Sequence, residues 1–253
     1  HARALEWPVV ILATGLFLAL AARRYPNRLR RRVGLIAVLV VGGLMCNIQY
    51  SLHQVFLLLD PSAWRPAPTL AFALMAGVPV VVLLLGNLYC GHLCPFGALQ
   101  ELIGDLRPRA WATDPAPAVW RLGRSVKYLL LFVLVMAFAT GRQAGALTAD
   151  PLTSVFSNGI DNPTFLFAVA LLVAAFFFRR FWCRSLCPAG AFLALLNAVK
   201  ILRRQLPKVH PAQCDLGVRR ARELDCIQCD RCRMDCQGLE KPAGEFPRIG
   251  IRE

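Results

Sequence analysis

Charged residues are scarce in this chain of 253 residues. They make up 17% of it, against about 25% in an ordinary soluble domain. Acidic residues are the scarcest, with 15 Asp and Glu against 29 Lys and Arg, and the formal net charge is +14. Apolar residues make up 57% and lie in long uninterrupted runs, which leave no polar helix face for water. This composition excludes an ordinary soluble enzyme, a disordered tail and a secreted disulfide scaffold.

Five apolar runs are long enough to cross a bilayer, which takes roughly 20 residues of helix. They cover roughly 7–22, 33–59, 68–89, 127–141 and 163–178. No window has the charged lead, short apolar run and cleavage site of a signal peptide. The first residue is His1 rather than Met, so we expect an upstream region in a longer product. The sequence predicts an all-α integral membrane bundle over 1–204.

Basic residues alternate between the links that join these spans. The links 23–32 and 105–127 and the tail after 178 are rich in Lys and Arg, whereas 60–67 has a single Arg and 143–161 has no Lys or Arg. Links rich in Lys and Arg stay on the cytoplasmic side. We therefore expect a bacterial inner-membrane protein with its N-terminus outside and its C-terminus in the cytoplasm. Because the arginines flank apolar spans, we expect the lipid bilayer, and no nucleic acid, as their partner.

The chain contains an internal repeat, with copies at about 60–104 and 150–202. Each copy follows an Asp-Pro pair, runs through an apolar span and ends in the pattern aromatic-Cys-x-x-x-Cys-Pro-x-Gly-Ala. The four cysteines of these patterns are Cys90, Cys94, Cys183 and Cys187. Duplicated membrane halves commonly place a shared site at the repeat interface.

The prolines of the two patterns, Pro95 and Pro188, suit the first turn of a helix, where no amide donor is needed. The cysteines would then lie just ahead of a helix N-terminus, whose positive end favours thiolate. Four such thiolates can hold one [4Fe–4S] cluster at the cytoplasmic rim. The alternative is a packing role, which we expect for Cys46 in the second span.

A second cysteine motif lies near the C-terminus, in a cytoplasmic segment over 205–253. The residues Cys226, Cys229, Cys232 and Cys236 have the C-x2-C-x2-C-x3-C spacing of bacterial ferredoxins. In two-cluster ferredoxins the fourth cysteine serves the neighbouring cluster, so one [4Fe–4S] cluster would take Cys214 with the first three. The competing assignment takes the four cysteines of the motif itself. Zinc is the chemical alternative, and the spacing favours iron–sulfur.

The second predicted span contains unusual polarity for a membrane helix, at Asn47, Gln49, Ser51, His53 and Gln54. Such residues form interhelical hydrogen bonds or line a functional cavity. His53 is therefore a candidate quinone-binding or relay residue. A haem b with two histidine ligands is disfavoured, because no second histidine lies in a span.

The segments 89–102 and 183–191 resemble the two membrane motifs of the NosR/NapH-type membrane polyferredoxins, and 47–51 resembles a segment of the NosR branch. For the NosR branch, the resemblance implies an FMN-binding domain outside the membrane and a ferredoxin module after the spans. This chain contains no flavin domain, so FMN is expected only in residues upstream. For NapH-like members it implies electron transfer from quinol toward periplasmic reductases.

We therefore predict a membrane electron carrier with two [4Fe–4S] clusters and an all-α membrane bundle followed by a ferredoxin-like segment. It would link a cytoplasmic donor or the quinone pool to a flavin or reductase partner outside. The nearby Arg184, Arg231 and Arg233 would favour the reduced clusters. The sequence contains no acid–base or nucleophile constellation, which indicates an electron-transfer component rather than a self-contained enzyme. The alternatives are an iron–sulfur redox sensor or regulator and a metal-delivery or assembly protein.

Overall fold

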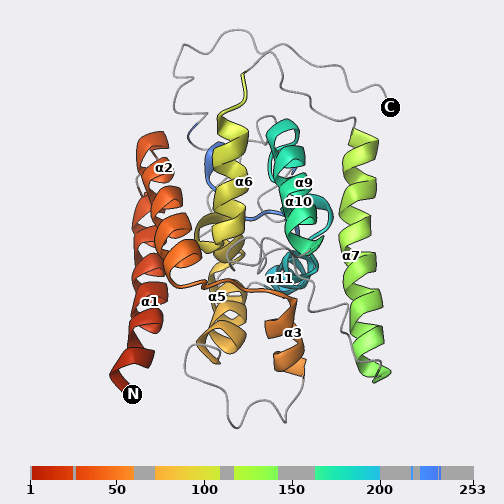
Figure 1. Ribbon diagram of the computed structural model, residues 1–253, viewed down its shortest axis with the longest axis horizontal. Helices are drawn as coiled ribbons and strands as arrows, with labels where there is room; N and C mark the ends of the chain where they lie inside the picture. Colours follow the sequence, from red (N-terminus) through yellow and green to blue (C-terminus); the bar gives the residue numbers. More distant parts are fainter. Residues whose placement is uncertain are drawn as a thin grey trace.

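The protein is described by a computed structural model that covers residues 2–24, 27–59, 72–108, 117–141, 163–199, 218, 223–232 and 234. The regular elements in these residues are α-helices and π-helical segments (η). They are α1 (Ala2–Arg24), α2 (Arg28–Ala37), η1 (Val38–Met45), α3 (Leu52–Leu59), η3 (Ala73–Gly77), α5 (Val78–Leu85), η4 (Tyr89–Leu93), α6 (Pro95–Asp105), α7 (Pro117–Ala139), α9 (Pro163–Phe177), α10 (Phe181–Ser185) and α11 (Pro188–Val199). Figure 1 shows α1 and α2 at one edge, α7 at the opposite edge, and α5, α6, α10 and α11 between them.

The apolar core lies between these two edges, where η4 and α6 meet α5, α10 and α11. Phe96 of α6 and Val82 of α5 are completely buried, and Leu193 of α11 packs in the same cluster. Phe56 of α3 stacks on Phe138 of α7 with ring centroids 4.6 Å apart, which joins these two helices near the lower end of Figure 1. The core therefore surrounds the segments that carry the first cysteine pair.

The predicted span 33–59 is not one helix. The helical path of α2 and η1 ends at Met45, and Asn47 has a φ of 46°, a left-handed conformation that interrupts a helix. The polar side chains bond within the break: Gln49 donates to the side chain of Asn47, and Ser51 donates from its backbone N–H and its hydroxyl to Gln54 Oε1. The polar side chains at 47–54 therefore hydrogen-bond with one another and with the backbone at the point where the helix is interrupted.

A second break separates α5 from η4 at Gly86, whose φ is 87°. This positive φ favours glycine, and a Cβ here would also lie 1.9 Å from the end of the Gln228 side chain, which would have to move. Beyond the break, Asn197 of α11 accepts from the backbone N–H of Asn87 and donates to the carbonyls of Leu224 and Cys226. The buried Asn197 side chain thus joins the second repeat, the break in the first repeat and the C-terminal segment.

The two repeats fold in the same way around their cysteines. As the sequence predicts, α6 begins at Pro95 and α11 begins at Pro188. In the first repeat, Cys94 N–H donates to the carbonyl of the aromatic residue five positions earlier, at 2.9 Å, and Cys187 N–H makes the same bond in the second repeat, also at 2.9 Å. The second cysteine of each pair also caps the helix that follows, because its sulfur accepts from a backbone N–H in the first turn, that of Gly97 or Gly190.

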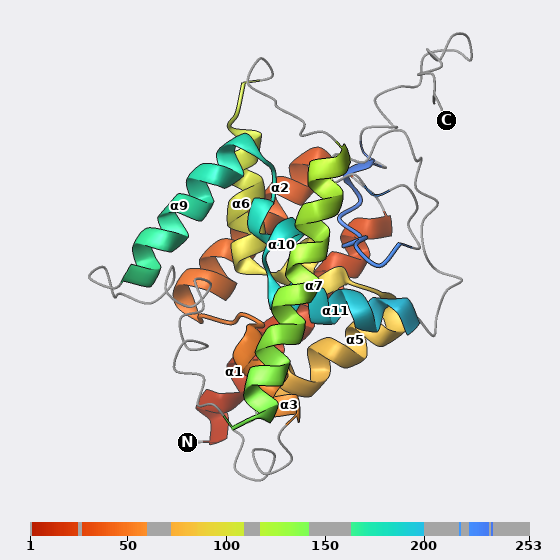
Figure 2. The same ribbon diagram turned by 90° about the vertical axis from the view of Figure 1, so that its right-hand side faces the viewer.

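The outer surface of the bundle is strongly apolar. Large hydrophobic residues point outward on α1, α2, α7 and α9, among them Phe17 (70% exposed), Phe132 (63%) and Leu166 (73%). Figure 2 shows α9 leaning away from the other helices. In the part of the chain that the structure describes, one helix is long and apolar enough to cross a bilayer, with the segment Leu122–Ala139 of α7 at a mean hydropathy of 1.8. Shorter apolar helices cover Val10–Ala21, Ala73–Leu85, Phe165–Phe177 and Pro188–Val199.

Candidate metal centre

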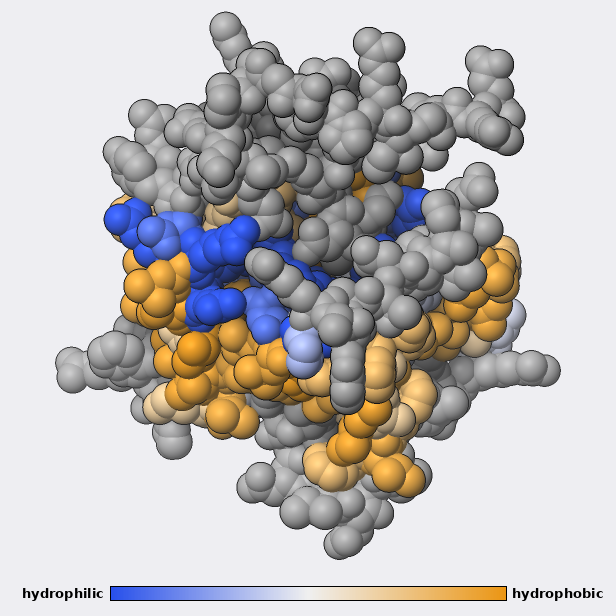
Figure 3. All heavy atoms as spheres, turned by 90° about the horizontal axis from the view of Figure 1, so that it is seen from above, coloured by the Kyte–Doolittle hydropathy of each residue, from blue (hydrophilic) through white to orange (hydrophobic). Residues whose placement is uncertain are grey.

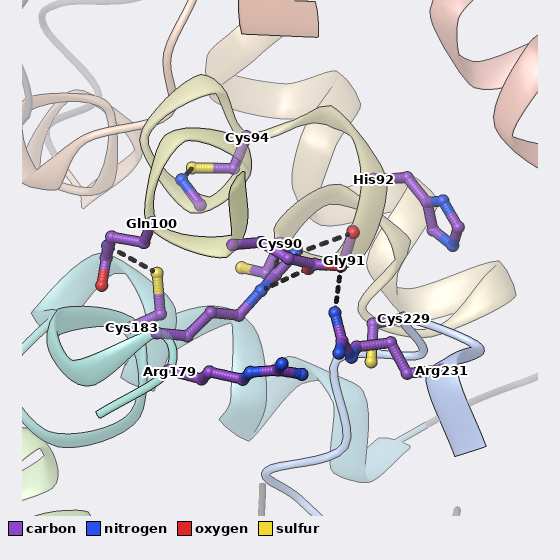
Figure 4. A network of polar contacts seen from close by, with 12 residues as sticks. Cys90, Gly91, His92, Cys94, Gln100, Arg179, Cys183, Cys229 and Arg231 are labelled. Carbon is purple, nitrogen blue, oxygen red and sulfur yellow. Dashed lines mark hydrogen bonds and ion pairs between the residues drawn. The ribbon is translucent and has the colours of Figure 1, made fainter. Parts of the chain in front are cut away.

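The four repeat cysteines line one cavity. Its walls include Cys90 and Cys94 from the first motif and Cys183 and Cys187 from the second. Figure 4 shows Cys90 and Cys94 on the η4–α6 turn with Cys183 of α10 beside them. The structure therefore brings these predicted site residues together, although Cys94 and Cys183 are 89 positions apart in the chain. Their role as ligands stays a prediction.

Hydrogen-bond donors lie at the sulfur atoms of this cavity. The Gly97 N–H lies 3.5 Å from Cys94 Sγ, and the Gly190 N–H lies 3.2 Å from Cys187 Sγ. The Gln100 amide donates to Cys183 Sγ at 3.4 Å. Donors to sulfur stabilise negative charge there, and they are a recognised means of raising the reduction potential of an iron–sulfur cluster.

The cavity is also lined by cationic side chains, namely Arg124, Lys127, Arg180 and Arg184. Burial, with a smaller contribution from Cys183, raises the pKa of Cys90 to about 12, whereas Arg180 and Lys127 lower it. The thiol form is therefore favoured while no metal is bound, and metal binding must release protons. The cations then compensate the negative charge of thiolate ligands.

The residues present fit an iron–sulfur cluster, because four thiols line one cavity and each can bind a different iron of a cubane. None of the eight cysteines in the described ranges forms a disulfide, so their thiols are available as ligands. The buried hydroxyl of Tyr50, which also lines the cavity, has no hydrogen-bond partner. It can donate to a sulfur atom there.

The C-terminal motif forms a loop with an unusual backbone. Gln228 and Asp230, on either side of the buried Cys229, have φ values of 51° and 55°. Left-handed residues other than glycine are uncommon, and successive N–H groups in such turns form the concave anion-binding arrangements found at phosphate and Fe–S sites. Cys226 and Cys232 are half-buried in the same loop. The loop geometry therefore supports a cluster here.

Two cysteines are candidates for the fourth ligand of the cluster in this loop. Cys214 and Cys236 lie outside the described residues, and so does Arg233. Both assignments of the fourth ligand, Cys214 and Cys236, therefore stay predictions from the cysteine spacing.

The two cysteine motifs touch through their backbones at Gly91. A Cβ placed on Gly91 would lie 2.2 Å from the Ile227 carbonyl oxygen and 3.3 Å from the Cys229 nitrogen. Next to this contact, His92 Nε2 lies 3.1 Å from the Gln228 carbonyl oxygen. Only glycine allows the C-terminal loop to approach the Cys90–Cys94 turn this closely.

A buried carboxylate, Glu101 of α6, holds both motifs in place. It is 2% exposed and binds Arg31 of α2, Arg180 before α10 and Arg231 of the C-terminal loop. Burial alone would raise the pKa of Glu101, but Arg180 and Arg31 outweigh it and hold the pKa well below its usual range. The carboxylate is therefore ionised in the folded protein.

The arginines bound to Glu101 also reach the backbone of the cysteine motifs. Arg180 donates to the carbonyls of Cys90 (2.7 Å) and Gly91 (3.2 Å). Arg31 donates to the carbonyls of Gly91 (3.3 Å) and Cys229. Both arginines therefore bind the Gly91 carbonyl, and each also binds the carbonyl of one cysteine.

Helix α7 fixes the start of the C-terminal loop. Asp225, the residue before Cys226, accepts hydrogen bonds from Lys127 and from the Tyr128 hydroxyl at 2.8 Å. Arg124 lies 3.9 Å from the same carboxylate. This contact places the first cysteine of the loop next to the cavity of the repeat cysteines, because Asp225 and Lys127 line that cavity.

Sequence reasoning missed Glu101 and treated the arginines of 23–32 only as orientation signals. A signal for Glu101 was present in the repeat itself. Gln100 and Glu101 correspond to Leu193 and Ala194 in the second copy, so the first copy is polar where the second is apolar. Arg180 corresponds in the same way to Asn87.

The structure also shows where His53, Cys46, Arg184 and Arg231 lie, the other residues singled out from the sequence. His53 is exposed on α3 and lines neither this cavity nor the groove described below, so its role stays a prediction. Cys46 packs against the apolar core, as expected. Arg184 lines the cavity, and Arg231 binds Glu101 and Asp105.

Comparison with known proteins agrees with the two repeats. The family described as "4Fe-4S binding domain" matches residues 67–113 and 163–208. The regulatory protein NosR of Pseudomonas aeruginosa is 31% identical over 92% of this chain, and protein NirI of Paracoccus denitrificans is 34% identical over 88%. The putative electron transport protein YccM of Escherichia coli is 30% identical over 80%. No solved structure matches the chain.

The motifs, the cavity and these matches define a chain with two regions of the 4Fe-4S binding type, similar to proteins named as ferredoxin-type and electron transport proteins. The chain belongs to the NosR/NapH family, as its motifs indicated. It spans 37% of the length of NosR and of NirI and 54% of the length of YccM.

Gly91→Ala should weaken the contact between the two motifs, because the new Cβ would overlap the Ile227 carbonyl. We expect a lower thermal unfolding temperature and faster proteolysis of the C-terminal segment. Gly77→Ala is the matched control, since its Cβ would have no atom within 4 Å. Equal protease resistance in the two variants would contradict the contact.

Proposed function

We propose that this chain carries electrons through two [4Fe–4S] clusters, one in each cysteine site. Cys90, Cys94, Cys183 and Cys187 would hold the first. The second would be held by the C-terminal loop, with Cys214 or Cys236 completing the set Cys226, Cys229 and Cys232. The observation that carries the proposal is that the thiols of the two matched 4Fe-4S regions line one cavity. Each cluster supplies a one-electron couple when bound.

The residues of the chain would prepare these sites for electron exchange. Thiolates would hold iron, while backbone N–H groups and Gln100 donate to sulfur. The buried arginines and Lys127 favour the more negative, reduced state, because charges interact strongly where water is excluded. The contact at Gly91 keeps the two sites next to each other, so that electrons need not pass through solvent.

A bacterial inner-membrane location is proposed for the bundle. Exposed apolar patches of this extent on a protein mark contact with a membrane or a partner. Figure 3 looks down on the top of Figure 1, and hydrophilic residues gather there in a band beside hydrophobic residues. Arg23, Arg28 and Arg32 lie at this end, where α1 finishes and α2 begins. The excess of arginine favours a cytoplasmic position for it, with the N-terminus outside.

The electron donor we favour is a membrane quinol, with a cytoplasmic donor as the alternative. A groove of about 1000 Å³ lies between α1 and α2, and its walls include Val10, Leu18, Val33 and Val38. Its lining also includes His92 and Asp230; Asp230 follows Cys229, and His92 contacts the carbonyl of Gln228 before it. Apolar walls with a few polar residues beside a proposed redox site suit a lipophilic ring with an isoprenoid tail. His53 lies outside this groove.

The acceptor would lie outside the membrane, as a flavin domain or a reductase partner. Both clusters are proposed on the cytoplasmic side, and a hydrocarbon core is about 30 Å thick. The path to the outer side would therefore need a further redox group on another segment or protein.

A redox sensor is the second candidate, favoured by the name of one relative, the regulatory protein NosR. The same clusters would then change oxidation state slowly and alter a partner contact. Rapid, repeated oxidation by an external acceptor supports the carrier, whereas a single slow reduction with a change in protease pattern supports the sensor.

Anaerobically purified protein should contain about eight irons and eight acid-labile sulfides per chain, because each [4Fe–4S] cluster holds four of each. Cys183→Ala should lower the iron content by about half, while Cys46→Ala, which only packs, should retain it. Fewer than about four irons in the wild type would refute the two-cluster proposal.

An epitope inserted after Gly141 should be accessible to antibody in intact spheroplasts, because α7 ends there on the proposed outer side. One inserted after Arg107, beyond the end of α6, should be reached only after permeabilisation. Equal accessibility of the two epitopes in intact spheroplasts would overturn the orientation.

Gly34→Leu should fill the groove, since Gly34 lines it and a Cβ there meets no atom within 4 Å. We expect at least a several-fold loss of affinity for decylubiquinone, measured by fluorescence quenching. Gly77→Leu, equally free of contacts but away from the groove, is the control. Unchanged affinity in Gly34→Leu would exclude the groove as the quinone site.

A further inference from the structure

One buried group of charges is shared by the two cysteine sites. Glu101 carries one negative charge, and three arginines that bind it carry positive charges from three separate segments of the chain. Arg31 Nε lies 2.6 Å from Glu101 Oε1, and Arg180 Nε lies 2.8 Å from Oε2. Arg231 Nη1 lies 3.1 Å from Oε1. We call these four residues the Glu101 cluster.

Three of the four residues of the Glu101 cluster are buried away from water. Arg180 and Glu101 are each 2% exposed, and Arg31 is 9% exposed. Charges in such a place interact over longer distances than charges at the surface, because neither water nor salt screens them. A change of one charge here should therefore alter the electrostatic potential at both cysteine sites.

The arginines of the Glu101 cluster contact both motifs directly. Arg180 lines the cavity of the repeat cysteines and binds the Cys90 carbonyl. Arg31 binds the carbonyl of Cys229 in the other motif. Both arginines bind the same Gly91 carbonyl, so one set of positive charges lies between the two sites.

Glu101 opposes these arginines and also fixes their positions. Reduction adds negative charge to a cluster, which nearby positive charge stabilises and nearby negative charge destabilises. Removing the Glu101 charge would leave the arginines uncompensated. Their full charge would then favour the reduced state at both sites.

We propose that Glu101 is a positioning residue that sets the reduction potentials of the two cysteine sites together, through arginines that contact both. This proposal rests on the proposed function, because it assumes a cluster in each site. It differs from the role expected for Arg184, Arg231 and Arg233 alone, since the shared residue is an acid whose loss should raise both potentials.

Redox titration monitored by EPR on the full chain tests this. Glu101→Gln keeps the shape and an acceptor oxygen for the arginines but removes the charge. We expect both midpoint potentials to shift to more positive values. The matched control is Asp105→Asn on the same helix, which binds Arg231, Arg32 and Arg179 rather than the two arginines that donate to the cysteine carbonyls. Its shifts should be clearly smaller.

Arg231→Gln provides a second variant in case Glu101→Gln does not assemble. It removes a positive charge at a more exposed position of the Glu101 cluster and should move both potentials to more negative values. A shift confined to one site, or no shift in a variant that retains its iron, would refute the shared role. Wild-type protein without two clusters would instead refute the proposed function, so the two failures are distinguishable.

Discussion

The ion pairs around Glu101 are the constraint on which the arrangement of the site depends. A carboxylate removed from water is costly unless oppositely charged donors surround it, and here three arginines do so. These arginines come from α2, from the turn before α10 and from the C-terminal loop, so satisfying one buried charge brings three distant segments together. Loss of one of these charged residues would leave the others buried and uncompensated, so the three segments should hold their positions together or not at all.

Interrupted helices also help to bring the cysteine motifs together. The break at 47–51 and the break at Gly86 expose backbone groups that a continuous helix would satisfy internally. Tyr89 joins the two breaks, because its hydroxyl accepts the Tyr50 N–H at 2.7 Å. Irregular backbone inside an apolar bundle is stable only where protein groups complete its hydrogen bonds. These breaks turn the chain so that the Cys90–Cys94 turn faces the second repeat.

Much of the site follows from the sequence because its signals are local. Cysteine spacing and the prolines after it predict the two motifs, and the helix starts at Pro95 and Pro188 are confirmed. The prediction of one continuous span over 33–59 was wrong. Hydropathy is averaged over a window, so it does not distinguish a polar residue that forms an interhelical hydrogen bond from one at which a helix ends. Arg31 and Glu101 are 70 residues apart, and a single sequence contains nothing that pairs them.

The most direct test of the account is EPR spectroscopy of the fully reduced, anaerobically purified protein. Two clusters joined by the contact at Gly91 should give a spectrum broadened or split by spin–spin interaction between two reduced [4Fe–4S] centres. Partial reduction, which leaves one centre paramagnetic, should give a simple signal. A fully reduced spectrum that is the plain sum of two non-interacting signals, or that contains one cluster only, would contradict the claim that the two cysteine sites form one electron-transfer unit.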